Sequence, residues 1–408
     1  MTTVLDEFRL ASGWKEVPFR SVAIKVSQSG FPDLESLSVF LNAGVVPRSS
    51  REDNHNQLGE SLDKYQRVLP NDLVFNKLRT WQGGFGVSNY EGIVSPAYII
   101  ARPDTSAIDP KFLDYLLKSK PYLAELTRLS KWMPPTQFDI SWESIRELKL
   151  RIPPLKTQIK IVQYLDKFVP LINRLVTLFQ EQLDLSKDAF KVLVEQKTSA
   201  ILNENDNKIS LRRIARIDPN TSIPESLDPL VTFLGLEDVQ PGKLANFDIY
   251  RGVDEVASGY SRFRSGDILV PKVSPSFGHG RAVVVPNSVS EVGFASTEIY
   301  VIRCNNPRDA DYVCASLRSR DFLLQGESTY QGVAGVKRAD KEFILNWRIR
   351  WPEENLRAEI AREIDEAQKK LELLEEFTKK GVSNLIELRS SLIFDAVTGN
   401  SLLDLEVG

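Results

Sequence analysis

The stretch "RIPPLKTQIKIVQYLDK", Arg151–Lys167, marks a point where the periodicity of the sequence changes. A strand-like "ELKLRI" leads into Pro153 and Pro154, and apolar residues then recur at helical spacing. A second stretch, "RWPEENLRAEIAREIDE", Arg350–Glu366, repeats this order of features. The two stretches are therefore predicted to be copies of one junction, where a mixed domain ends and a long helix begins.

Long helical tracts follow both junctions. The first tract has an apolar stripe whose members lie four and three residues apart: Ile161, Leu165, Phe168, Ile172, Leu175 and Phe179. The second tract extends from about Glu354 to Val397, and its stripe is Ile360, Ile364, Ala367, Leu371, Leu374, Val382, Leu385, Leu388 and Leu392. Long, narrow stripes are typical of coiled coils, so we expect the two tracts to pack against each other. The alternative is that each tract packs against a neighbouring globular domain.

Two residues bear on how these helices are built. Pro170 lies inside the first tract and is predicted to kink or divide the helix, because proline removes a backbone donor and clashes with the preceding turn. Gly399, in "VTGN", is predicted to cap the end of the second tract.

The segments before the two tracts align with each other in ordered blocks. "LPNDLVFNK" matches "FRSGDILVPK", which pairs Asp72 with Asp267 and Lys77 with Lys272. "GIVSPAYIIARP" matches "GFASTEIYVIRC", "DPKFLDYLLKSKPY" matches "DADYVCASLRSRDF", and "ISWESIRELKLRIPP" matches "ADKEFILNWRIRWPE". So long a period indicates domain duplication, because solenoid repeats are only about 20–50 residues long. The predicted parts are a mixed α/β domain at 1–152, a helical region at 153–205, a similar domain at 206–351 and a second helical region at 352–408.

Composition and motifs restrict the function. The 408 residues are 42% hydrophobic and 26% charged, as in an ordinary globular protein, and no apolar run is long enough to span a membrane. No secretory pattern opens the sequence, so the cytoplasm is the expected location. Cys304 and Cys314 are interpreted as packing residues, since a zinc site needs about four close ligands. With two histidines and no phosphate loop, nucleophile elbow or zinc motif, no catalytic constellation is found.

Several loops of the mixed domains combine Lys or Arg with Ser, Thr, Gln and an aromatic residue. They are "VVPRSSRED", "NKLRTWQGGFG", "LSKWMPPTQFD", "PKVSPSFGHGRA" and "STYQGVAGVKRADK". This mixture suits a DNA duplex, because the cations neutralise phosphates and Arg, Gln or Asn can pair with base edges. The formal net charge of −3 argues against a nucleic-acid binder, but a local basic face can still bind phosphate. Two similar, diverged domains would suit an asymmetric DNA sequence split into two parts.

The whole pattern resembles the specificity (S) subunit of type I restriction–modification systems. The best local matches are "GDILVPK" (Gly266–Lys272), "STEIYVIR" (Ser296–Arg303) and "L-R-I-P-P-L-x-x-Q-x-x-I-V-x-x-L-D" (Leu150–Asp166). The second copy of the last motif is degraded, with Arg357 where the first has Gln158.

The resemblance implies an α+β fold with pseudo-two-fold internal duplication. Two target-recognition domains would each read half of a bipartite DNA sequence, and the two helices would form an antiparallel coiled coil that sets the spacer. The chain would be non-catalytic and would assemble with two methyltransferase subunits and with restriction/translocase subunits. S-adenosylmethionine, ATP and Mg would belong to those partners, and this chain would hold no cofactor and no metal.

Within this interpretation, loop chemistry selects the candidate DNA-binding residues. For the first half-site they are Lys77, Arg79, Thr80, Trp81, Gln82, Lys131 and Gln137, and for the second Lys272, Ser274, Ser276, Arg281, Tyr330, Lys337 and Arg338. Two alternatives stay open: the recognition subunit of a type IIB-like enzyme, and a coiled-coil scaffold protein that does not bind DNA.

Overall fold

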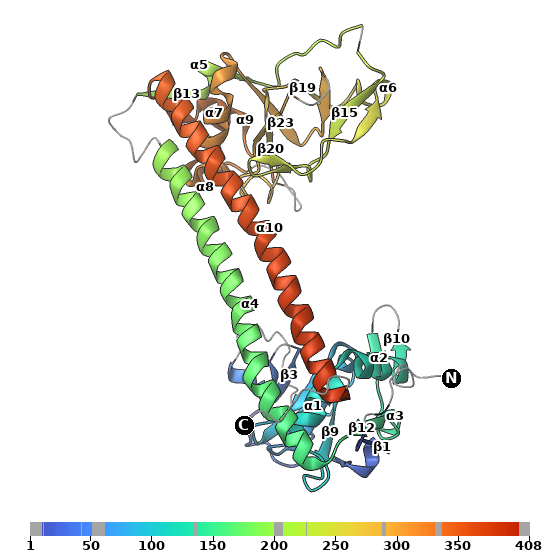
Figure 1. The fold of residues 1–408 in the computed structure, drawn as a ribbon. Helices are drawn as coiled ribbons and strands as arrows, with labels where there is room; N and C mark the ends of the chain where they lie inside the picture. The colour runs from blue at the N-terminus through green and yellow to red at the C-terminus, as the bar shows by residue number, and fades with distance from the viewer. Residues whose placement is uncertain are drawn as a thin grey trace. The chain divides into compact units, whose positions relative to one another are not determined.

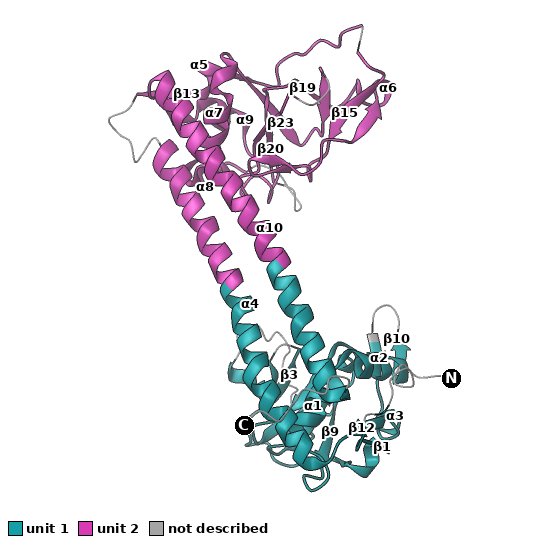
Figure 2. Cartoon of the chain, viewed as in Figure 1, with its two compact units in different colours: residues 1–178, 381–408 teal, residues 179–380 magenta. Residues whose placement is uncertain are grey.

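The computed structural model describes residues 10, 12–41, 43–50, 62–133, 137–199, 207–225, 227–287, 291–330 and 337–399. The chain divides into two compact units, residues 1–178 with 381–408 and residues 179–380 (Figure 2). Each unit combines a mixed domain of strands and short helices with part of both long helices (Figure 1). The predicted α+β class is confirmed.

The mixed domain of unit 1 is built around an antiparallel sheet in the order β2-β9-β6-β7. The strands of this sheet are β2 (Ala23–Val26), β6 (Leu73–Asn76), β7 (Phe85–Val87) and β9 (Tyr98–Pro103). The paired strands outside it are β1 (Lys15–Pro18) with β12 (Lys149–Ile152), β3 (Leu37–Phe40) with β4 (Gly44–Pro47), β5 (Gln66–Val68) with β8 (Gly92–Val94), and β10 (Lys131–Met133) with β11 (Gln137–Asp139). The short helices are η2 (Phe19–Ser21), η3 (Arg48–Ser50), η4 (Thr80–Gln82), α1 (Pro110–Lys118), α2 (Lys120–Leu129) and α3 (Trp142–Ile145).

Unit 2 repeats this plan with an antiparallel sheet in the order β14-β23-β20-β21. Its strands are β14 (Ala215–Ile217), β20 (Ile268–Pro271), β21 (Val283–Val284) and β23 (Ile299–Cys304), and β13 (Lys208–Ser210) pairs with β24 (Arg348–Arg350). A second sheet contains β18 (Tyr250–Gly252), β15 (Leu230–Leu234), β22 (Gly293–Ala295) and β19 (Ser261–Phe263), and β16 (Val239–Gln240) pairs with β17 (Lys243–Leu244). The short helices are α5 (Leu211–Ile214), α6 (Val253–Val256), η5 (Pro307–Asp309), α7 (Ala310–Ser316), α8 (Arg320–Ser328) and α9 (Lys341–Asn346).

A buried ion pair shows that the two sheets are copies of each other. In unit 1, Asp72 is 1% exposed and accepts two hydrogen bonds from Arg102, at 2.7 and 2.8 Å. In unit 2, Asp267 is 2% exposed and accepts two from Arg303, at 2.7 and 2.6 Å. Both carboxylates also accept a backbone N–H from three residues earlier. The aligned aspartates therefore have the same role, and the predicted duplication is confirmed.

The two junctions are also built alike, although their sequences differ. Gln158 is fully buried; its carbonyl accepts the backbone N–H of Asp109, and its amide donates to the Pro153 carbonyl at 2.9 Å. At the aligned position in unit 2, Arg357 pairs with Asp309 at 2.9 Å and donates to the Pro352 carbonyl. Both side chains tie the first turn of a long helix to the mixed domain, so the degraded motif preserves the contact.

The long helices are α4 (Leu155–Thr198) and α10 (Glu354–Thr398). Within unit 2, Lys187 of α4 pairs with Glu375 of α10 at 3.2 Å, and Lys197 pairs with Glu363 at 2.6 Å. Numbers rise along one helix as they fall along the other, so the helices are antiparallel there. In unit 1, Asn173 accepts from Arg389 at 2.7 Å, and α4 and α10 share the core. The predicted pairing of the two tracts is confirmed within each unit.

Details of the helix predictions need correction. Pro170 does not divide the first tract, because α4 is one helix with Pro170 exposed on its surface. Leu175 and Leu388 were expected in the apolar stripes but are 44% and 53% exposed. Since each helix also packs on a mixed domain near its ends, its buried face does not follow one heptad register throughout. Gly399 has a φ of +69°, the left-handed conformation expected of a C-cap glycine.

Candidate nucleic-acid interface

The loop after β6 is fixed at both ends by backbone hydrogen bonds. Lys77 donates its N–H to the Ala97 carbonyl at 3.4 Å, and its own carbonyl accepts the N–H of Ile140 at 3.2 Å. At the other end, Gly83 has a φ of +84°, and a Cβ on Gly84 would lie 2.7 Å from the Arg79 carbonyl oxygen. The glycine pair therefore permits a tight turn that a side chain would block.

The structure places this loop beside the β10–β11 hairpin. The ring of Trp81 lies 5.2 Å from that of Phe138, which lies 4.9 Å from that of Trp132 in an edge-on arrangement. Trp81 also donates its indole N–H to the Leu78 carbonyl at 3.2 Å. The loop after β6 and the β10–β11 hairpin, which are distant in the sequence, thus lie together in unit 1.

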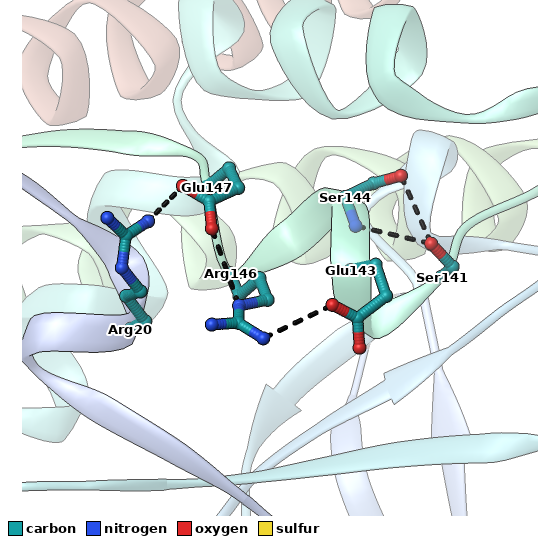
Figure 3. Close-up of polar contacts among 6 residues, drawn as sticks. All are labelled: Arg20, Ser141, Glu143, Ser144, Arg146 and Glu147. Atoms are coloured by element: carbon teal, nitrogen blue, oxygen red, sulfur yellow. Dashed lines mark hydrogen bonds and ion pairs between the residues drawn. The ribbon is translucent and has the colours of Figure 1, made fainter.

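Helix α3 anchors the segment that follows the hairpin (Figure 3). Ser141 caps this helix by accepting the backbone N–H of Ser144 at 3.2 Å. Arg146 pairs with Glu143 at 3.2 Å, and Arg20 pairs with Glu147.

Unit 2 has a related anchor at α9. There Asp340 is the N-cap, and Arg212 pairs with Glu342 at 2.8 Å. These contacts fix the base of each candidate interface without using the residues expected to bind DNA.

The loop after β20 is attached in the same way as its counterpart in unit 1. Lys272 donates its N–H to the Glu298 carbonyl at 2.9 Å, and its carbonyl accepts the N–H of Ala339 at 2.8 Å. Ser274 donates its N–H to the Lys337 carbonyl at 2.8 Å. The structure therefore also brings together the two candidate segments of unit 2.

Most candidate cations form no close ion pair with a carboxylate. In the described part of the chain, six of them are outside ion-pair distance of any carboxylate: Lys77, Arg79, Lys131, Lys272, Arg281 and Lys337. Arg338 differs, because its guanidinium donates to both oxygens of Glu298 at 3.0 and 2.6 Å and lowers the pKa of that carboxyl. Lys272 lowers that pKa further through its charge, and its ammonium lies 4.9 Å from the centre of the Tyr300 ring. Each unit thus presents three unpaired cations around its loop, which is the chemistry that phosphates require.

Some of the remaining candidates support the loops from inside. Thr80 is fully buried and donates its hydroxyl to the Asn76 carbonyl at 2.7 Å. Ser276 is 6% exposed, and the hydroxyl oxygen of Tyr330 is buried, which raises the pKa of that phenol. Thr80 and Ser276 are therefore turned away from solvent, whereas Gln82 is exposed and Tyr330 and Ser274 are half-buried. The sequence did not distinguish the two groups, because burial here depends on packing across the domain.

The remaining candidate residue of unit 1 lies in a strand. Gln137 belongs to β11. Residues 51–53, 134–136 and 331–336 of the candidate loops lie outside the described residues, as does His55.

Neither cysteine has the environment of a reactive thiol. Cys304 and Cys314 are buried in the core of unit 2, and burial raises the pKa of both thiols to about 12. Among residues with described positions, no group of three acidic, histidine or cysteine side chains could hold a metal ion. None of the described helices is apolar over a length sufficient to cross a bilayer.

Parts of the chain are similar to two curated proteins. No protein-family model matches the chain. The EcoEI type I restriction enzyme specificity subunit of Escherichia coli is 34% identical over 107 residues, which cover 26% of this chain and 18% of that protein. The EcoAI specificity subunit of the same species is 29% identical over 146 residues, 35% of this chain and 24% of that protein. The matched regions thus span less than a quarter of the length of these relatives.

Solved structures extend the similarity to nearly the whole chain. A chain from a structure describing complex assembly and conformational transition of the type I restriction–modification system has a TM-score of 0.70 at 14% identity, covering 97% of this chain and 100% of that one. The HsdS subunit from Thermoanaerobacter tengcongensis has a TM-score of 0.56 at 13% identity, covering 97% and 99%. The chain therefore has the fold of type I specificity subunits.

Proposed function

We propose that this chain is the DNA sequence-specificity subunit of a type I restriction–modification complex. Each unit would read one half of a bipartite, asymmetric DNA sequence. One observation carries the proposal. The loops after β6 in unit 1 and after β20 in unit 2 are attached at equivalent positions, and each has three cations around it that form no ion pair with a carboxylate. Two copies of one phosphate-binding arrangement are what two half-sites require.

The role of this chain in the complex is recognition without catalysis. Two methyltransferase subunits would transfer methyl groups from S-adenosylmethionine to adenine, and restriction/translocase subunits would use ATP and Mg. The support for these partners is the relationship to type I specificity subunits and the fold shared with them. We expect the complex to act in the cytoplasm, where its DNA substrate would be.

Binding should depend steeply on salt. The chain would be purified with its methyltransferase partner, and its affinity for a duplex carrying the cognate site would be measured between about 50 and 200 mM salt. Six phosphate contacts predict that log K falls against log salt with a slope of about −5, because each contact releases about 0.9 counterion.

The same titration tests the competing interpretation. A coiled-coil scaffold that contacts only proteins would show no measurable affinity for the duplex, or an affinity independent of salt. Either of those results would rule out the proposed phosphate-binding loops.

A further inference from the structure

Trp132 lies at one end of a row of three aromatic rings in unit 1, followed by Phe138 and then Trp81. Its side chain is 50% exposed on β10, although an indole contributes much apolar surface. The edge-on contact with Phe138, at 4.9 Å between ring centres, holds one side of the ring. Phe138 in turn packs against Trp81, which is hydrogen-bonded to its own loop. Trp132 is therefore a supported aromatic side chain that offers a free surface to a ligand.

The surroundings of Trp132 favour a polyanion as that ligand. Arg79 is exposed on the neighbouring loop, and Lys131 is exposed on the opposite face of the same strand, across from Asp139 in the register. Neither cation forms an ion pair with a carboxylate in the described part of the chain. An interface with another protein is typically depleted of lysine at its core, whereas lysine and arginine beside DNA neutralise phosphates.

The supporting element also has a suitable shape. β10 and β11 form a two-stranded antiparallel ribbon, with Trp132 opposite Phe138 in the register. The major groove of B-DNA accommodates such a ribbon, and apolar side chains there contact the 5-methyl group of thymine.

We propose that Trp132 is a specificity-determining residue that makes apolar contact with base edges in the major groove of one half-site. This inference rests on the proposed function and adds a direct reader of bases to the phosphate contacts. Unit 2 lacks the ring that supports Trp132, because Lys337 is the residue aligned with Phe138. The two units would then read their half-sites by different chemistry, as an asymmetric site demands.

The test compares three variants of the full chain in complex with its methyltransferase partner. Trp132→Ala removes the contact, Trp132→Phe keeps an aromatic surface, and Tyr90→Ala removes a 42% exposed aromatic elsewhere in unit 1. The probes are a duplex carrying the cognate site and one in which both half-sites are scrambled. We expect Trp132→Ala to bind the cognate duplex about tenfold more weakly and the scrambled duplex equally well, while the other two variants stay within about threefold of the parent.

Genome-wide methylation by the same variants gives a second measurement. Trp132→Ala should relax the methylated sequence in one half of the motif only, whereas Tyr90→Ala should leave both halves unchanged. Equal losses on cognate and scrambled duplexes, no loss on either, or loss of the co-purifying methyltransferase would each overturn the inference. The proposed function fails separately, if the parent complex shows no preference for the cognate duplex.

Discussion

Replacing Arg303 with methionine is expected to destabilise unit 2 by about 3 kcal/mol, because removing one partner of a buried ion pair leaves the other without compensation. Asp267 would keep its backbone N–H from Arg264 but would lose both guanidinium bonds in a site that is 2% exposed. Hydrogen exchange measured by mass spectrometry should show about 100-fold lower protection of the β20 and β23 amides.

An exposed ion pair in the same unit provides the control. The side chain of Arg308 is 84% exposed and lies 3.6 Å from Glu354, so Arg308→Met should change stability by less than about 1 kcal/mol. The double variant Asp267→Asn with Arg303→Met should recover part of the lost stability, since an amide still accepts the Arg264 N–H and leaves no buried charge. If the β20 and β23 amides are as well protected from hydrogen exchange in the Arg303→Met variant as in the Arg308→Met variant, the buried pair does not stabilise the sheet.

Removing the three unpaired cations of unit 1 should nearly abolish its contribution to DNA binding. The variant Lys77→Gln, Arg79→Gln, Lys131→Gln loses three phosphate contacts, so the affinity of the complex for cognate duplex should fall on the order of 100-fold at low salt. The slope of log K against log salt should become shallower by about 3 for the same reason. Fluorescence anisotropy with a labelled duplex measures both quantities.

The matched control has the same change in net charge. Lys15, Lys25 and Lys64 are exposed in unit 1 outside the loop and the hairpin. Converting these three lysines to glutamine should leave the salt slope within about one unit of the parent if binding is confined to the loop and the hairpin. Equal effects of the two triple variants would indicate attraction by overall charge and would remove the argument for a defined interface.

The duplicated plan could be predicted because it left local signals in the sequence. Apolar periodicity identified both long helices, and the ordered blocks aligned Asp72 with Asp267 and Lys77 with Lys272 before either pair had a structural meaning. In both units the aspartate pairs with an arginine of the neighbouring strand, and the backbone of the lysine attaches the loop.

Contacts between distant parts of the chain were not predictable in the same way. In the sequence, Arg357 departs from the motif that contains Gln158. In the structure, however, Gln158 donates to the Pro153 carbonyl and Arg357 donates to the Pro352 carbonyl. This equivalence appears only when the fold shows that both side chains face the same buried carbonyl. The proposed role of Trp132 in DNA binding likewise depends on the pairing of β10 with β11 and on the position of Phe138 between two tryptophans.

We propose that one chain with two similar units directs recognition of one split DNA sequence. The most direct measurement is to co-express the chain with its methyltransferase partner in a host lacking other adenine methylation, and to map methylated adenines across the genome. We expect a single asymmetric motif in two parts, separated by a spacer of fixed length and unspecified sequence. Methylation of a short continuous site, or no methylation that depends on this chain, would contradict it.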